Sequence, residues 1–322
     1  MSVTLITPVF LLCLFTSCHS ISLFLKDDNA EYGQGFEVSI HEVPYIGTLR
    51  YYSKEVEELG SGMFCMAIPI KNRVLLAAAH CVFNKKHEDV VVVLGSSNLR
   101  IRSPTTKMLS VSFWRWHPLY KMLQPPYDIA VVFTYNDIEP IAGAIQYAPL
   151  NLHEVPKRTK CLISSWTRLS DGVQKRADTM QAIWVSTMDR KFCILTIDAP
   201  GYMCSKTEVS TVGVNTGDLG APVVCDDKLS GITCFILPTR GITFNTAINV
   251  YAKWIRASVY LYFKGSPPTV APTTSTTAKR RSIRNKLRSG QLRPICNQWI
   301  VLSVISIHVI FTIPTFDFDF NL

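Results

Sequence analysis

The chain has 322 residues, of which 48% are hydrophobic and ten are cysteines. It is long enough for one large domain or two small ones with appendages, and it holds enough apolar residues for a packed core. The formal net charge of +9 comes mostly from seven cations between residues 279 and 293. The rest of the chain therefore lacks the global positive field that suits nucleic acid, and no stacking-aromatic or zinc-ligand pattern indicates nucleic acid either.

The first twenty residues, 1–20, contain an apolar run from Leu5 to Phe15 and then small or polar residues. This run is shorter than the about 20 apolar residues that cross a bilayer. We therefore expect a secretory signal peptide, with a buried first helix as the alternative. Removal of 1–20 leaves a chain that begins near Ile21 in an extracellular, oxidising compartment, where cysteines pair.

Short β-branched or alternating runs, separated by turn residues, extend from about Val38 to Val250 and predict an all-β barrel or sandwich. The clearest runs are VVVVLG, MLSVSFWRW, DIAVVFTY, KCLISSW, QAIWVST, FCILTI, APVVC, LSGITCFIL and ITFNTAINV. After them, residues 251–263 place apolar side chains at helical intervals, which predicts a helix that closes the domain.

The composition changes after residue 263. Residues 264–278 are rich in Pro, Thr and Ser and predict a linker, open to O-glycosylation, that cannot bury enough apolar surface to fold. The basic segment 279–293 is a solvated run, a contact for anionic lipid or glycan, or a cleavage site. The hydrophobic tail 299–314 fits a lipid-anchor signal, a short membrane span or a soluble extension, so cell-surface anchoring stands beside secretion as an expectation.

Three motifs in the β-rich region carry reactive or turn-forming residues. The stretch VLLAAAHC (74–81) ends a predicted strand with a histidine beside a cysteine. YDIAVV (127–132) places an aspartate at the head of an apolar strand, and GDLGAP (217–222) follows later in the chain. Each motif alone is weak, but their order and spacing together are specific.

In these motifs the chain resembles the chymotrypsin-like serine proteases, over roughly Tyr32 to Tyr260. The resemblance implies two six-stranded Greek-key β-barrels with a C-terminal helix, in a domain spanning 32–263. It also implies that His80 matches the general base and Asp128 the carboxylate that orients it. Leu219 stands where the family has its nucleophilic serine, and leucine has no lone pair with which to attack.

Other positions that match the family's site are altered too. Along the specificity pocket, the family's Ser-Trp-Gly is replaced by Cys234, Phe235 and Ile236, and Ile236 is expected to fill the pocket's mouth. Gly213 stands where a trypsin-like enzyme has an aspartate at the pocket base. Glu31 precedes the position of the family's activated amino terminus, so no trypsin-like cleavage site lies there. The turn residues Gly217 and Asp218, which shape the oxyanion hole in the family, are retained.

The cysteines provide an independent comparison with the family. The resemblance implies three retained disulfides, Cys65 with Cys81, Cys161 with Cys225, and Cys193 with Cys204. The bridge that usually braces the specificity pocket is missing, because Asn215 occupies one of its positions. Cys234 is then an odd thiol near Asp128, where burial and negative charge raise a thiol pKa and disfavour nucleophilic attack.

We expect no cofactor and no metal, since the histidines show no ligand spacing. The sequence favours a secreted or surface-tethered serine protease homologue that lacks the nucleophile and binds protein partners. These homologues act as cofactors, decoys or adaptors in proteolytic pathways. The alternative is a serine-type endopeptidase of the same family that retains proteolytic activity.

Overall fold

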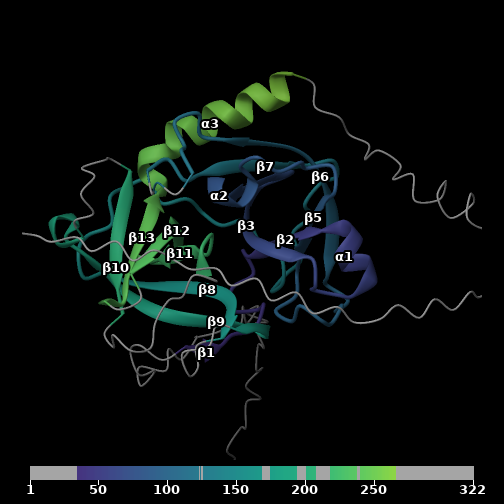
Figure 1. Cartoon of the computed structure of the whole chain (residues 1–322), viewed down its shortest axis with the longest axis horizontal. Helices are drawn as coiled ribbons and strands as arrows, with labels where there is room; N and C mark the ends of the chain where they lie inside the picture. Colours follow the sequence, from purple (N-terminus) through teal and green to yellow (C-terminus); the bar gives the residue numbers. More distant parts are fainter. Residues whose placement is uncertain are drawn as a thin grey trace, which may run out of the picture. The chain divides into compact units, whose positions relative to one another are not determined.

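A computed structural model describes residues 35–265 apart from 123, 125, 169–174, 194–200, 208–217 and 238–239 (Figure 1). The predicted signal peptide, basic segment and hydrophobic tail, and the linker beyond Gly265, lie outside these residues. In the described part of the chain, no helix is long and apolar enough to cross a membrane.

The amino-terminal half folds into a closed barrel of six antiparallel strands in the order β2-β3-β4-β7-β6-β5. Its strands are β2 (Gly47–Tyr51), β3 (Met63–Lys71), β4 (Val74–Ala77), β5 (Val90–Leu94), β6 (Lys107–Trp116) and β7 (Ala130–Thr134). Two short helices, α1 (Tyr52–Glu57) and α2 (Ala79–Val82), follow β2 and β4. Strands β4, β5 and β7 are buried along their whole length, which explains their continuous apolar sequences.

The second barrel has the order β9-β10-β13-β12-β11-β8 and is closed by the pairing of β8 with β9. Its strands are β8 (Lys160–Arg168), β9 (Lys175–Met188), β10 (Tyr202–Lys206), β11 (Pro222–Cys225), β12 (Lys228–Leu237) and β13 (Ile242–Ala247). A two-residue strand, β1 (Phe36–Glu37), pairs with β9 at the edge. The prediction of two six-stranded barrels is confirmed.

Helix α3 (Ile248–Lys264) confirms the predicted closing helix and begins three residues earlier than expected. It packs against β7 of the first barrel and β12 of the second (Figure 1). Tyr262 stacks on Phe133 of β7 with ring centroids 3.7 Å apart, and its hydroxyl lies 2.6 Å from the Ser112 hydroxyl on β6. The apolar face of the helix therefore packs against both barrels.

The strand predicted from FCILTI is wrong at its first residue, because Phe192 ends the 3-10 helix η1 (Arg190–Phe192). The side chain of Asp189 accepts a hydrogen bond from the backbone N–H of Lys191 at 3.2 Å and thereby caps this turn. Such a cap favours a helical turn over an extended strand. Residues 194–200 of the same stretch lie outside the described residues.

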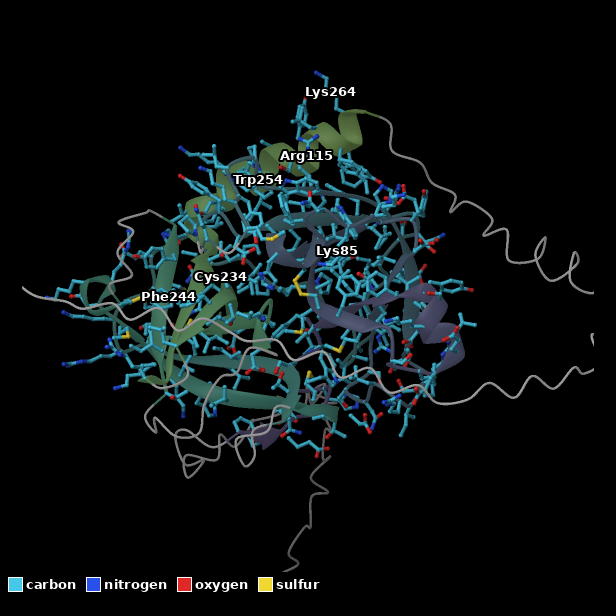
Figure 2. All side chains as sticks on the ribbon, viewed as in Figure 1. Lys85, Arg115, Cys234, Phe244, Trp254 and Lys264 are labelled. Atoms are coloured by element: carbon cyan, nitrogen blue, oxygen red, sulfur yellow. A yellow bond between two sulfur atoms is a disulfide. The ribbon has the colours of Figure 1, made fainter. Side chains whose placement is uncertain are left out.

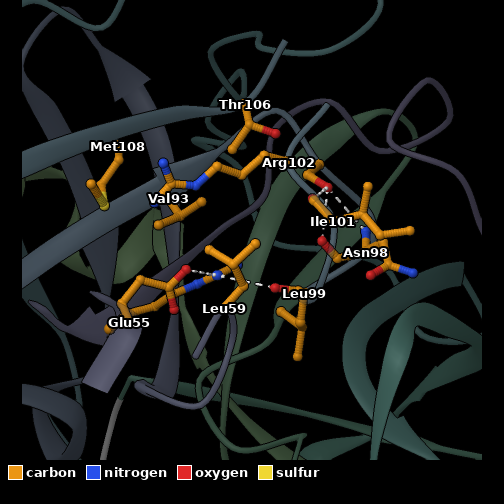
Figure 3. Close-up of a pocket in the computed structure, with 11 residues that line it drawn as sticks. Glu55, Leu59, Val93, Asn98, Leu99, Ile101, Arg102, Thr106 and Met108 are labelled. Atoms are coloured by element: carbon orange, nitrogen blue, oxygen red, sulfur yellow. Dashed lines mark hydrogen bonds and ion pairs between the residues drawn. The ribbon is translucent and has the colours of Figure 1, made fainter. Parts of the chain in front are cut away.

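A buried ion pair joins β2 to the short helix α1 (Figure 3). Arg50 of β2 and Glu55 of α1 lie 2.6 Å apart, with side chains only 3% and 2% exposed. Arg50 also donates to the Thr48 hydroxyl at 2.7 Å, and Glu55 accepts from the backbone N–H of Gly60 at 2.8 Å. Both charges are thus compensated beside a space of about 10 Å³, the size of one water molecule.

Candidate active site

His80 and Asp128 form a hydrogen-bonded couple in the first barrel. Strand β4 leads directly into α2, which carries His80, and Asp128 lies two residues before β7. The Nδ1 of His80 lies 2.6 Å from Oδ2 of Asp128, and the backbone N–H of His80 donates to Oδ1 at 2.8 Å. The carboxylate is buried while the imidazole is 27% exposed. A proton on Nδ1 leaves Nε2 as the basic nitrogen, which is the arrangement of a general base.

Three contacts that the sequence did not predict hold Asp128 in place. Tyr127 has a positive φ of 64°, a strained conformation for a bulky residue, and its backbone N–H donates to the Tyr251 hydroxyl at 3.1 Å. The Thr246 hydroxyl donates to the Asp128 carbonyl at 2.9 Å. Gly201, with φ of 101°, passes so close that a Cβ there would lie 2.1 Å from the Tyr251 hydroxyl. No local motif marks these residues, because each contact joins segments far apart in the chain.

Leu219 lies on a tight turn of the second barrel, against the disulfide of the first. The following residue, Gly220, has φ of 88°, and a Cβ on it would lie 2.8 Å from Cys65 Sγ and 3.1 Å from Cys81 Sγ. Only glycine fits this backbone and this approach. Cys81 is the chain neighbour of His80, so the turn lies against the segment that carries the histidine. The half-buried Leu219 side chain packs against the second-barrel core.

Asp218 precedes this leucine and is buried, with 4% of its surface exposed. It accepts a short hydrogen bond from the Ser165 hydroxyl of β8. A hydroxyl therefore meets this buried carboxylate. Its neighbour Gly217 and the pocket-base residue Gly213 lie outside the described residues, as does Asn215.

Strand β12 carries the three altered pocket residues. Ile236 is 6% exposed and belongs to the apolar core of the second barrel, while Phe235 is half-buried and packs edge-on against Phe244. Cys234 sits at a register shift between Thr233 and Phe235, where the strand bulges. Bulges re-aim side chains beside functional sites. The isoleucine therefore fills buried space on the strand where the family has a glycine.

The Cys234 thiol is free and buried, and it donates to the carbonyl of Phe244 at 3.1 Å (Figure 2). Burial, and then the negative charge of Asp128, raise the pKa of this thiol well above its ordinary value. This is the direction that the sequence predicts. A thiol that keeps its proton is a poor nucleophile, so this environment does not activate Cys234.

We expect the Cys234 thiol to resist alkylation in the folded protein. With iodoacetamide at pH 8, its modification should be at least about 100-fold slower than in urea, because each unit of raised pKa lowers the thiolate fraction tenfold. Peptide mass spectrometry measures the rate. Since the folded state holds the proton more tightly, the contribution of this thiol to stability is complete below the unfolded pKa of about 8.5 and falls as the pH rises above it. Equal rates of Cys234 alkylation with and without urea would contradict the conclusion that this thiol is buried in the folded protein.

Three disulfides join Cys65 to Cys81, Cys161 to Cys225, and Cys193 to Cys204, the pairs that the resemblance implies. Disulfides of this kind form in an oxidising, extracellular compartment. Within the described ranges, Cys65, His80 and Cys81 are the group whose atoms lie close enough to hold a metal ion. The two sulfurs are bonded to each other and offer no thiolate, so the group does not fit a metal.

The family model named Trypsin matches residues 32–255, well over half of the chain. The chain therefore belongs to the trypsin family. It is similar to mouse (Mus musculus) granzyme F, with 24% identity over 235 residues, which cover 70% of this chain and 90% of that protein. Mouse neutrophil elastase is 30% identical over 179 residues, covering 54% of this chain and 64% of that protein.

Rat (Rattus norvegicus) transmembrane protease serine 9 is 27% identical over 195 residues, which cover 58% of this chain but only 17% of that protein. Among solved structures, mouse neuropsin matches with a TM-score of 0.60 and 23% identity, covering 70% of this chain and 98% of that chain. Human heparin binding protein matches with a TM-score of 0.59 and 22% identity, covering 70% and 96%. At these identities the solved structures support the fold alone.

Proposed function

We propose that this protein is a serine protease homologue that does not cleave peptide bonds and acts by binding other proteins. The observation that carries the proposal is Leu219 at the nucleophile position, on the turn that packs against the Cys65–Cys81 disulfide, while the His80–Asp128 couple is formed. An imidazole base activates a serine by taking its hydroxyl proton, and a leucine side chain has neither a proton to give nor a lone pair. His80 is therefore oriented by Asp128, but the residue at the nucleophile position offers it no proton to accept.

The altered strand β12 supports the same proposal. A substrate side chain needs an open pocket, and Ile236 is buried in the core there. A triad that has lost one member keeps only about 10³- to 10⁴-fold catalysis over water, and that remainder depends on bound substrate. Loss of both the nucleophile and the pocket opening leaves a rigid, disulfide-linked scaffold whose surface can still bind proteins.

The purified protein should not hydrolyse a broad library of internally quenched peptides. Release of fluorescence is the measurement, with mouse neutrophil elastase as the positive control and the His80→Ala variant beside the unaltered chain. Identical background rates for the two chains support the proposal. Hydrolysis by the unaltered chain that disappears in His80→Ala would show that the couple still performs general-base catalysis. That result would overturn the proposal.

The second candidate is a serine-type endopeptidase with unusual chemistry. The short contact of 2.6 Å between His80 and Asp128 favours it, because it is the geometry that a working general base needs. Its weakness is that the nucleophile position holds Leu219 and that burial keeps the proton on the Cys234 thiol. A serine-directed phosphonate that labelled the unaltered protein would favour this candidate.

We place the protein outside the cell, either secreted or tethered through the tail at 299–314. The signal-like segment 1–20 and the three disulfides support export. Release from intact cells by a phosphatidylinositol-specific phospholipase would support a lipid anchor. Recovery of all the protein in the medium, with its carboxyl terminus intact, would exclude tethering.

A further inference from the structure

A depression of about 420 Å³ lies on the surface of the first barrel. One wall is residues 85–88, which follow α2, and the other is residues 113–116, the last four of β6. Its volume falls within the range of about 300–1,000 Å³ that ligand sites in proteins occupy. None of these residues belongs to the turn that carries Leu219 or to strand β12, which carries Ile236.

Aromatic rings form the walls of this depression. The His87 ring packs edge-on against Phe113 and Trp114, with centroid distances of 6.2 and 5.7 Å. Phe113 is 36% exposed yet is held from behind by Tyr262 of α3, whose ring stacks on it at 6.0 Å. Trp116 meets Phe83 edge-on at 5.4 Å. These contacts fix the walls before any ligand arrives, which reduces the entropy cost of binding.

The rim of the depression is positively charged. Arg115 is half-buried and Lys86 is exposed, and in the described part of the chain neither forms an ion pair. Glu88 is the only acidic lining residue, so the balance is positive. Nδ1 of His87 is buried and has no hydrogen-bond partner among the described residues.

Lys85 ties this depression to the helix that carries His80. Its Nζ donates to the Cys81 carbonyl at 2.7 Å and to the His80 carbonyl at 3.4 Å, and burial lowers the pKa of its ammonium group. Lys85 and Arg115 both lie on the first-barrel side of the molecule (Figure 2). Lys85 is thus occupied, and Arg115 and Lys86 are the cations available to a ligand.

We infer that this depression binds an acidic segment of a partner protein, in which aromatic or aliphatic residues alternate with carboxylates. A guanidinium pairs with a carboxylate through two parallel hydrogen bonds, and a half-buried Arg115 does so in a low dielectric. The apolar residue packs against the exposed ring of Phe113, which is on the same face of β6 as Arg115. Aromatic and arginine side chains are enriched in protein-binding hot spots. The inference rests on the proposed role as a protein binder and gives that role a surface.

The test uses a fluorescein-labelled octapeptide, TFDFDFNL, and a matched peptide in which both aspartates are asparagine. Fluorescence anisotropy is recorded on the full-length chain. We expect saturable binding of the acidic peptide that salt weakens. The asparagine peptide should bind with an affinity at least about tenfold lower than that of the acidic peptide. Arg115→Gln should weaken binding of the acidic peptide at least about tenfold, and Phe113→Leu should weaken it without changing the charge.

Lys107→Gln is the matched control, because it removes one positive charge from the opposite, exposed end of β6. It should bind as the unaltered chain does, and thermal unfolding of each variant checks that it is folded. If Arg115→Gln and Lys107→Gln bind equally, or if no saturable binding occurs below about 1 mM, near the weak limit of specific recognition, the inference is overturned.

Two further outcomes would assign the depression to another occupant and overturn the inference. One is Arg115-dependent binding of a sulfated heparin hexasaccharide without binding of the peptide. The other concerns this chain itself, whose residues 315–322 have the probe's sequence. If the double variant Asp317→Asn/Asp319→Asn of the full chain binds the peptide about tenfold more tightly, residues 315–322 of this chain compete for the depression and are its occupant.

None of these binding measurements depends on hydrolysis. Cleavage of the peptide library would overturn the proposed function and leave the binding result standing. Absence of peptide binding in a protein that cleaves nothing would overturn only the inferred surface.

Discussion

Replacing Leu219 by serine is expected to leave the protein nearly unreactive toward a serine-directed phosphonate. The exchange places a hydroxyl beside a His80–Asp128 couple that is already formed, at a Nδ1–Oδ2 distance of 2.6 Å. Removal of the serine from a working triad costs about 10⁶ in kcat, so full recovery would be a very large effect. We expect labelling at least about 100-fold slower than that of neutrophil elastase, because misplacement of reacting groups by 1 Å alone costs that much.

The reason lies in the residues around position 219. Ile236 fills buried space on β12, and Cys234 stands where the family has a serine. A peptidyl phosphonate with a large side chain should therefore label Leu219→Ser/Ile236→Gly faster than Leu219→Ser, with Leu219→Ser/His80→Ala as the unreactive control. Strong labelling of Leu219→Ser alone would contradict the view that nucleophile and pocket were lost together. Site-localised mass spectrometry identifies the labelled residue.

Replacing Glu55 by glutamine should lower the free energy of unfolding by about 3–5 kcal/mol, the usual cost of removing one partner of a buried ion pair. Arg50 would keep its charge at 3% exposure with no carboxylate 2.6 Å away. The hydrogen bonds of Arg50 to the Thr48 hydroxyl and to the Leu99 carbonyl do not neutralise that charge. Urea denaturation followed by fluorescence measures the loss.

Glu57→Gln is the matched control for this experiment, because Glu57 lies on the same helix α1 and is exposed. Its effect should stay within about 0.5 kcal/mol, as for most surface substitutions. The double variant Arg50→Met/Glu55→Leu should regain much of the lost stability, since buried ion pairs are often no better than apolar residues of similar volume. A loss for Glu55→Gln as small as that for Glu57→Gln would show that water reaches the pair.

Much of the fold was predictable because its signals are local. Strands such as Val90–Leu94 and the helix over residues 251–263 follow from alternating, continuous or helical apolar patterns that the structure confirms. The strand predicted from FCILTI was wrong at Phe192, because the side chain of Asp189 caps a helical turn there. Side-chain hydrogen bonds to nearby backbone compete with strand formation in a way that hydrophobic patterns do not record.

The sequence by itself determined which chemical groups are present: a histidine and an aspartate in family motifs, six cysteines at family positions, and Leu219 where a nucleophile would stand. Only the tertiary structure decided what surrounds them. The strained Tyr127 held by the Tyr251 hydroxyl, the hydroxyl of Ser165 on Asp218, and the cations beside the rings of β6 each join distant segments. Residue identity follows from the sequence, whereas burial, strain and charge balance depend on long-range packing, because they arise only when separate strands meet.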